Sequence, residues 1–97
     1  MYGGIDMTEE AKNILIERMY TNLRILRTKL SLSQEELAQK LGISRYTVIQ
    51  IENGQRKMTW NTFLALVLIF IKNPETDELL SFYDIYTDEL NDMLKLK

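Results

Sequence analysis

The segment from Ser33 to Asn53 predicts two short helices joined by a tight turn, and no other feature constrains the fold as strongly. Ser33 and Glu36 have the spacing of a capping box, in which the two residues satisfy each other's backbone donors at a helix start. Gly42 stands where a left-handed residue ends that helix without steric cost. Ser44 is a suitable N-cap for the second helix, which we expect to end at about Asn53.

Helical periodicity also precedes this pair. Apolar residues recur at three- and four-residue steps between residues 9 and 30; they are Ala11, Leu15, Met19, Leu23, Leu26 and Leu30. Asp6 or Thr8 can cap this helix. Residues 20–22 are a possible interruption, because Tyr, Thr and Asn form helices poorly and Asn can cap a second start.

The chain beyond the pair is helical in pattern as well. Thr59 can cap a helix over residues 60–71, whose sequence is apolar nearly all round and therefore predicts burial on more than one side. Pro74 ends it, and residues 75–86 and 87–96 are expected to form one or two short helices. Met1–Gly4 is expected to be a loose leader. No strand pattern of useful length is present, so the sequence predicts an all-α fold.

Composition excludes several classes of protein. A length of 97 residues suits one compact helical domain, without a separate catalytic or sensing domain. The absence of cysteine and histidine removes disulfides, the usual zinc ligand sets and imidazole acid–base catalysis. Scattered carboxylates and the lack of a glycine-rich phosphate loop indicate no enzyme activity, metal site, cofactor or small-molecule effector. The apolar run at residues 63–71 is too short to span a membrane, which predicts a cytoplasmic protein.

Charge is unevenly distributed along the chain. Residues 20–60 contain seven Lys or Arg against three Asp or Glu, whereas residues 1–19 contain two against four and residues 61–97 contain three against seven. The basic middle can bind phosphates despite a net charge of −2, provided that the acidic flanks face away from the nucleic acid. Chance clustering of surface charge is the alternative interpretation.

The run LSQEELAQKLGISRYTVIQIENGQRK, residues 32–57, resembles the helix-turn-helix of phage-repressor and Cro-type proteins, the XRE family of transcriptional regulators. In this resemblance Ala38 is small where the two helices cross, and Gly42 makes the turn. The residues that fill the space beneath are Leu37, Ile43, Val48 and Ile51. A generic helical hairpin shares only two or three of these features.

The resemblance implies an all-α, lambda-repressor-like helix-turn-helix bundle of about five helices, with short helical extensions at both ends. It covers residues 22–71, the expected DNA-binding domain. Residues 1–21 are then the leader and N-terminal extension, and residues 72–97 are a C-terminal helical segment.

The resemblance also places the second helix, residues 44–53, in the major groove with its amino end at the base edges. It implies base contacts from Ser44, Arg45, Tyr46 and Gln50. Arg45 can donate two hydrogen bonds to guanine O6 and N7, and Gln50 can present a donor and an acceptor to adenine. Tyr46 has two possible uses: it can stack on sugar or touch a thymine methyl group, or its hydroxyl can bind a phosphate.

Other positions are expected to contact the DNA backbone or to hold the helices together. The expected phosphate contacts are Gln34, Thr47, Asn53, Arg56 and Lys57; a solvated loop is the alternative for the last two. Arg27 and Glu52 occupy the positions of a largely buried ion pair, with two separate surface charges as the alternative. Met58 stands where the family often has proline, which leaves the entry to the next helix less defined.

The C-terminal segment, residues 72–97, indicates whether the chain pairs with a second copy. It contains more apolar residues than so short a tail can bury against itself: Leu79, Leu80, Phe82, Tyr83, Ile85, Tyr86, Leu90, Met93, Leu94 and Leu96. We expect a homodimer, with completion of a monomer core as the alternative. The predicted function is transcription regulation, with repression as the expected role and double-stranded DNA as the partner. A helical protein-interaction or adaptor module, such as an antitoxin-like partner binder, is the second candidate.

Overall fold

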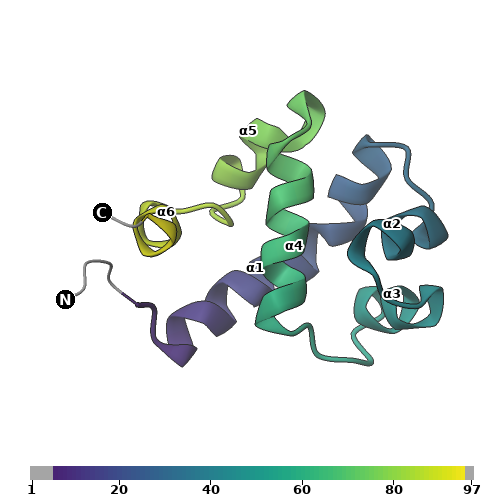
Figure 1. The fold of residues 1–97 in the computed structure, drawn as a ribbon, viewed down its shortest axis with the longest axis horizontal. Coiled ribbons are helices and arrows are strands. Elements are labelled where there is room, and N and C mark those ends of the chain that lie inside the picture. The colour runs from purple at the N-terminus through teal and green to yellow at the C-terminus, as the bar shows by residue number, and fades with distance from the viewer. Residues whose placement is uncertain (1–5, 96–97) are drawn as a thin grey trace.

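The computed structural model describes residues 6–95, and within that range it contains six α-helices and no strand (Figure 1). The helices are α1 (Glu9–Lys29), α2 (Gln34–Leu41), α3 (Arg45–Glu52), α4 (Trp60–Ile71), α5 (Pro74–Phe82) and α6 (Asp88–Leu94). The predicted all-α fold is confirmed. The expected leader, Met1–Gly4, and Leu96 lie outside the described residues. No helix in the described range is long and apolar enough to cross a membrane.

Helix α1 begins at the expected cap and runs without interruption. The Thr8 hydroxyl accepts a hydrogen bond from the Ala11 amide at 3.0 Å. Thr21 and Asn22 do not break the helix, because the stripe of Met19, Leu23 and Leu26 is buried on both sides of them. Their side chains donate to carbonyls four residues back, at 3.1 and 2.8 Å. The expected boundary between the N-terminal extension (residues 1–21) and the DNA-binding domain (residues 22–71) therefore falls inside a continuous helix.

The predicted pair of short helices is present with its capping residues. The Ser33 hydroxyl accepts from the Glu36 amide at 3.0 Å, and the Glu36 carboxylate accepts from the Ser33 amide at 2.8 Å. These hydrogen bonds lower the pKa of Glu36. Gly42 is left-handed, with φ of +73°, and the Ser44 hydroxyl caps α3 through the Thr47 amide at 3.0 Å.

Helix α4 crosses α1 near the middle of the molecule, with α2 and α3 on one side of it and α6 on the other (Figure 1). Four of its apolar side chains are buried in the single core: Phe63, Leu66, Val67 and Phe70. Half-buried residues flank these four, so the expected burial on more than one side is confirmed, while Leu68 remains 60% exposed on the outward face. The neighbouring helices cover the other faces only.

The C-terminal helices complete the core but are shorter than expected. Leu80, Ile85 and Leu90 are fully buried, so much of this segment belongs to the core of the single chain. Helix α5 starts at Pro74 and ends at Phe82 rather than Tyr86, because the chain turns at Asp84, which is left-handed with φ of +58°. Helix α6 ends at Leu94.

Candidate nucleic-acid interface

The exposed side of α3 carries the residues expected to contact bases. Arg45 and Tyr46 begin the helix and are exposed, with 66% of the surface of Tyr46 accessible. On the opposite side, Val48 and Ile51 are buried in the core. Because Val48 and Ile51 fix α3 in the core, the exposed residues of its first turn face solvent in a fixed orientation.

Gln50 is linked to the loop that follows α3. Its side-chain oxygen accepts a hydrogen bond from Arg56 Nε at 2.9 Å, and its backbone carbonyl accepts from the Gln55 amide at 2.8 Å. Gly54 makes the turn with φ of +75°. An expected base-contacting residue and an expected phosphate-contacting residue therefore lie side by side.

The loop after α3 is attached to α1 by one side chain. The Tyr20 hydroxyl donates to the Arg56 carbonyl at 2.7 Å and accepts from the Met58 amide. Met58 itself is buried, 1% exposed. A proline at position 58 has no N–H and cannot make this hydrogen bond. The entry to α4, uncertain from the sequence, is thus defined by Tyr20 instead of a rigid turn.

Burial raises the pKa of the Tyr20 phenol, and the charge of Glu17 adds to the effect, while the hydrogen bond from the Met58 amide opposes it. The phenol therefore keeps its proton at neutral pH, which it needs in order to donate to the Arg56 carbonyl.

Arg27 and Glu52 join α1 to α3 by two parallel hydrogen bonds. Arg27 Nε lies 2.6 Å from one Glu52 carboxylate oxygen, and Nη2 lies 3.1 Å from the other. The side chains are 11% and 1% exposed. Arg27 Nη1 also donates to the Leu32 carbonyl at 2.8 Å. The bidentate geometry fixes the angle between the two helices as well as their distance.

Gln34 is connected to the same carboxylate. Its side-chain nitrogen donates to Glu52 Oε1 at 2.9 Å, so α2 is tied to α3 beside the ion pair. Burial alone would raise the pKa of Glu52, but hydrogen bonds from Arg27 and Gln34 and the charges of Arg27 and Arg24 outweigh it, and the pKa is lowered. Glu52 is therefore a carboxylate that connects three helices.

The expected phosphate-contacting residues lie in three places. Gln34 is at the start of α2, whereas Asn53, Arg56 and Lys57 lie together in the exposed loop after α3. Thr47 is half-buried in the first turn of α3, with its hydroxyl 2.9 Å from that of Ser44. Along the chain, the base-contacting candidates lie between Gln34 and Asn53.

Tyr20 holds the loop after α3 in place, a role that its sequence context alone does not predict. It follows Met19 of the apolar stripe by one position, and Arg27 follows Leu26 in the same way. A helix position next to a buried stripe faces the border of the core, where a polar tip can contact a neighbouring segment. That spacing places Tyr20 on the same side of α1 as Arg27, but it does not indicate which segment the phenol contacts.

Tyr20→Phe is expected to lower the free energy of unfolding by about 1–2 kcal/mol, because it leaves a part-buried amide and a carbonyl without their partner. The Met58 amide should exchange its hydrogen faster. Tyr86→Phe is the matched control: it removes a phenol that donates to Asn91 at 2.7 Å, away from the loop. Unchanged exchange at Met58 in Tyr20→Phe would contradict the proposed attachment.

The two capped helices, the left-handed glycine turn and the outward α3 define a helix-turn-helix domain. The helix-turn-helix family model matches residues 23–67. A protein of Archaeoglobus fulgidus, described as an uncharacterized HTH-type transcriptional regulator, is 32% identical over 66 residues, which cover 68% of this chain and 91% of the relative. The chain belongs to the XRE-type helix-turn-helix family, a family of DNA-binding domains, and the resemblance is confirmed. No solved structure matches the chain.

Proposed function

We propose that this protein regulates transcription by binding double-stranded DNA sequence-specifically, with α3 in the major groove, and that it acts as a repressor. The observation that carries the proposal is the placement of α3. Its exposed amino end holds Arg45 and Tyr46, while Glu52 at its other end is bonded to α1 and α2. A helix held in this way can present side chains to base edges with little loss of backbone conformational freedom on binding.

The distribution of charge supports the same orientation. The basic loop after α3 is on the same side of α4 as α3, whereas α6, which contains Asp88, Glu89 and Asp92, lies across α4 from it (Figure 1). DNA bound along α3 meets Arg45, Arg56 and Lys57 and is kept away from the acidic α6. This arrangement reconciles a net charge of −2 with DNA binding.

The proposal includes a homodimer in the cytoplasm. An α3 of eight residues contacts only a few base pairs, too few to select one site in a genome. Exposed apolar surface is available for a partner subunit: Leu68 is 60% exposed and Leu94 is 47% exposed. Both line a groove between α4 and α6, together with Leu64, Val67, Ile71 and Tyr86. We refer to these six residues as the α4–α6 groove.

Binding to mixed-sequence duplex DNA at several salt concentrations tests the proposal. The affinity should fall steeply between about 50 and 200 mM salt, because Lys and Arg release counterions from phosphates. Selection from a random duplex pool should then enrich one two-fold symmetric sequence. A protein-interaction module, the second candidate, would show no salt-dependent affinity for DNA and would enrich no sequence.

Arg45→Ala should lose about 1–3 kcal/mol at one base pair of the selected site and relax discrimination there. Lys57→Ala is the comparison: it should weaken specific and mixed-sequence binding alike and reduce the salt slope by about one. Affinities for a set of single-base variants of the site measure both effects. Equal weakening by Arg45→Ala on every sequence would assign Arg45 to a phosphate instead.

A further inference from the structure

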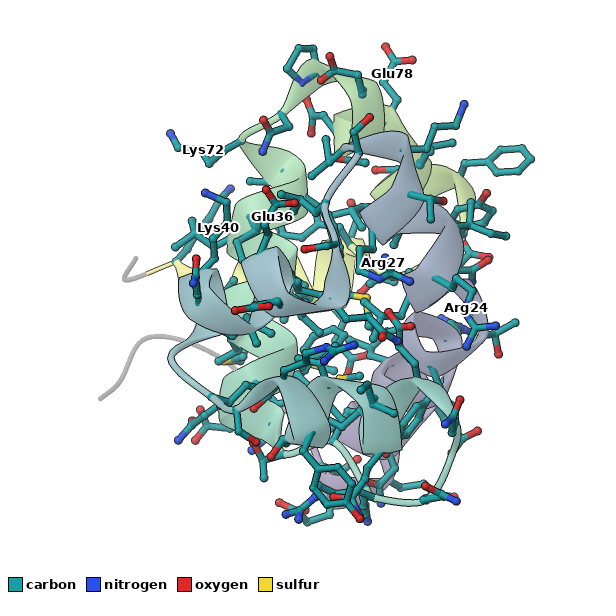
Figure 2. All side chains as sticks on the ribbon, turned by 90° about the vertical axis from the view of Figure 1, so that its right-hand side faces the viewer. Arg24, Arg27, Glu36, Lys40, Lys72 and Glu78 are labelled. Carbon is teal, nitrogen blue, oxygen red and sulfur yellow. The ribbon has the colours of Figure 1, made fainter. Side chains whose placement is uncertain are left out.

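A cavity of about 490 Å³ lies where the carboxyl ends of α1, α2 and α4 meet. Its walls come from residues 29–32, from Lys40, and from side chains between residues 68 and 75. Figure 2 shows two of these side chains, Lys40 and Lys72, close together at one edge of the molecule. None of the lining residues belongs to α3 or to the loop after it. We refer to this space as the lysine cavity.

Three lysines surround the lysine cavity, one at the carboxyl end of each helix: Lys29, Lys40 and Lys72. All three are exposed. Among the described residues, ion pairs are formed by Lys12, Arg24 and Arg27, and by none of these three lysines. A lysine near a helix carboxyl end interacts favourably with the helix dipole, yet its ammonium group has three N–H donors for an external acceptor. The cavity can therefore offer ammonium donors from three directions.

Acidic side chains only partly offset this charge. Glu75 is the one acidic residue that lines the cavity. Glu36 lies near Lys40 in Figure 2, but its carboxylate accepts from the Ser33 amide at 2.8 Å in the capping box. Positive charges exceed negative charges by three to two even when Glu36 is counted. The lysine cavity is therefore a place where an anion is favoured.

The floor of the lysine cavity is apolar. Four side chains form it: Leu30, Leu32, Leu68 and Ile69. Leu68, which is 60% exposed, also lines the α4–α6 groove, whereas the other three are half-buried against the core. The α4–α6 groove differs because no charged residue lines it. An apolar body with a negative charge therefore fits the lysine cavity better than the groove.

The loop between α1 and α2 gives the cavity a fixed wall. Ser31 is left-handed, with φ of +55°, and its amide donates to the Thr28 carbonyl at 3.0 Å. The Leu32 amide donates to the Arg27 carbonyl at 3.2 Å. These two hydrogen bonds close the end of α1 and hold the loop. The cavity is thus preformed, and its volume lies in the range of small-molecule sites, about 300–1,000 Å³.

We propose that the lysine cavity binds a small organic anion, with an apolar body and a carboxylate, sulfonate or phosphate group. The apolar body packs on the leucine floor, and the acid group accepts hydrogen bonds from Lys40 and Lys72. The inference does not depend on the proposed DNA binding. It departs from the expectation of no small-molecule effector, because the three lysines belong to separate helices and only the packing of these helices brings them together.

Fluorescence titration with anilinonaphthalene sulfonate, an aromatic anion, tests the proposal. Anilinonaphthalene, the same molecule without the sulfonate, is the matched neutral probe. Lys40→Gln and Lys72→Gln should each weaken binding of the sulfonate about two- to fivefold, because each removes one exposed ionic contact. The double variant should weaken it roughly tenfold. The affinity for the neutral probe should be the same in all variants.

Lys95→Gln is the matched control variant, since it removes an exposed positive charge outside the lysine cavity. Lys95 follows Leu94 of the α4–α6 groove, so this variant also reports on a probe bound in that groove. It should bind the sulfonate as the wild-type protein does. Wild-type affinity in the double variant, or equal weakening by Lys95→Gln, would overturn the proposal.

Backbone amide NMR of the wild-type protein locates the sulfonate without any substitution. Its addition should shift the amide signals of residues 29–32 and 72–73 more than those of Leu64 and Leu94 in the α4–α6 groove. Larger shifts in the groove would contradict the proposed site. The salt slope of DNA binding should stay at its wild-type value in Lys40→Gln and Lys72→Gln. A slope reduced by about one would assign these lysines to DNA phosphates and overturn the inference.

Discussion

Arg27→Met is expected to lower the free energy of unfolding by about 3 kcal/mol, the largest loss that we expect from a polar substitution in this domain. The reason is the position of Glu52, whose side chain is 1% exposed and would keep its charge without its bidentate partner. Gln34 at 2.9 Å and Arg24 at 3.6 Å remain, which places the loss at the lower end of the range for broken buried pairs. Urea unfolding of the two proteins measures it.

Two controls separate the ion pair from simple loss of packing. Arg27→Met combined with Glu52→Leu should recover most of the stability, since no buried charge is left. Arg24→Met, at a largely exposed position, should cost less than about 1 kcal/mol. A double variant as unstable as Arg27→Met would show that the methionine, and not the isolated carboxylate, causes the loss.

The same pair contributes to the acid sensitivity of the fold. The pKa of Glu52 is lowered from 4.5, because the hydrogen bonds and charges of Arg27, Gln34 and Arg24 outweigh its burial. Its contribution to stability is therefore present above pH 4.5 and is lost as the pH falls through the lowered value. Glu52→Gln should be less stable at neutral pH, and its stability should vary less below pH 4.5.

The local signals of the helix-turn-helix could be predicted from the sequence because they act over three or four residues. The Ser33–Glu36 capping box, the Gly42 turn and the Thr8, Ser44 and Thr59 caps are all present. Each depends on hydrogen bonds between a side chain and a nearby backbone group. The end of α5 was not predictable in this way, because aspartate tolerates a left-handed conformation but does not require one.

Contacts between segments far apart in the sequence could be predicted only where the family resemblance indicated them. The resemblance pointed to Arg27 and Glu52, 25 positions apart, and the structure joins them. It gave no indication of the Tyr20–Arg56 contact across 36 positions or of the Gln34–Glu52 hydrogen bond. These contacts depend on how α1, α2 and α3 pack, which residue spacing along one helix does not determine.

The second large effect expected is dissociation of the proposed dimer by Leu68→Glu. Deleting residues 75–97 would not test the dimer, because it removes Leu80, Ile85 and Leu90 from the core of the subunit itself. Leu68 is 60% exposed in the α4–α6 groove, so a charge there should spare the fold. Phe82→Glu is the matched control, since Phe82 is 78% exposed on α5 and does not line the groove. Equilibrium sedimentation should find a dimer for the control and a monomer for Leu68→Glu.

Loss of the dimer should reduce affinity for the selected site by about 10²–10⁴-fold, because the second subunit no longer binds as part of the same molecule. Affinity for an isolated half-site should not change, since Leu68 lies in α4, outside both α3 and the loop that follows it. In the wild-type footprint the two half-sites should be centred about 34–36 Å apart, one turn of DNA, with one copy of Arg45 and Gln50 in each.

A wild-type protein that stays monomeric on saturated DNA and protects an asymmetric site would rule out the dimer. Dissociation by Phe82→Glu but not by Leu68→Glu would instead place the interface on α5.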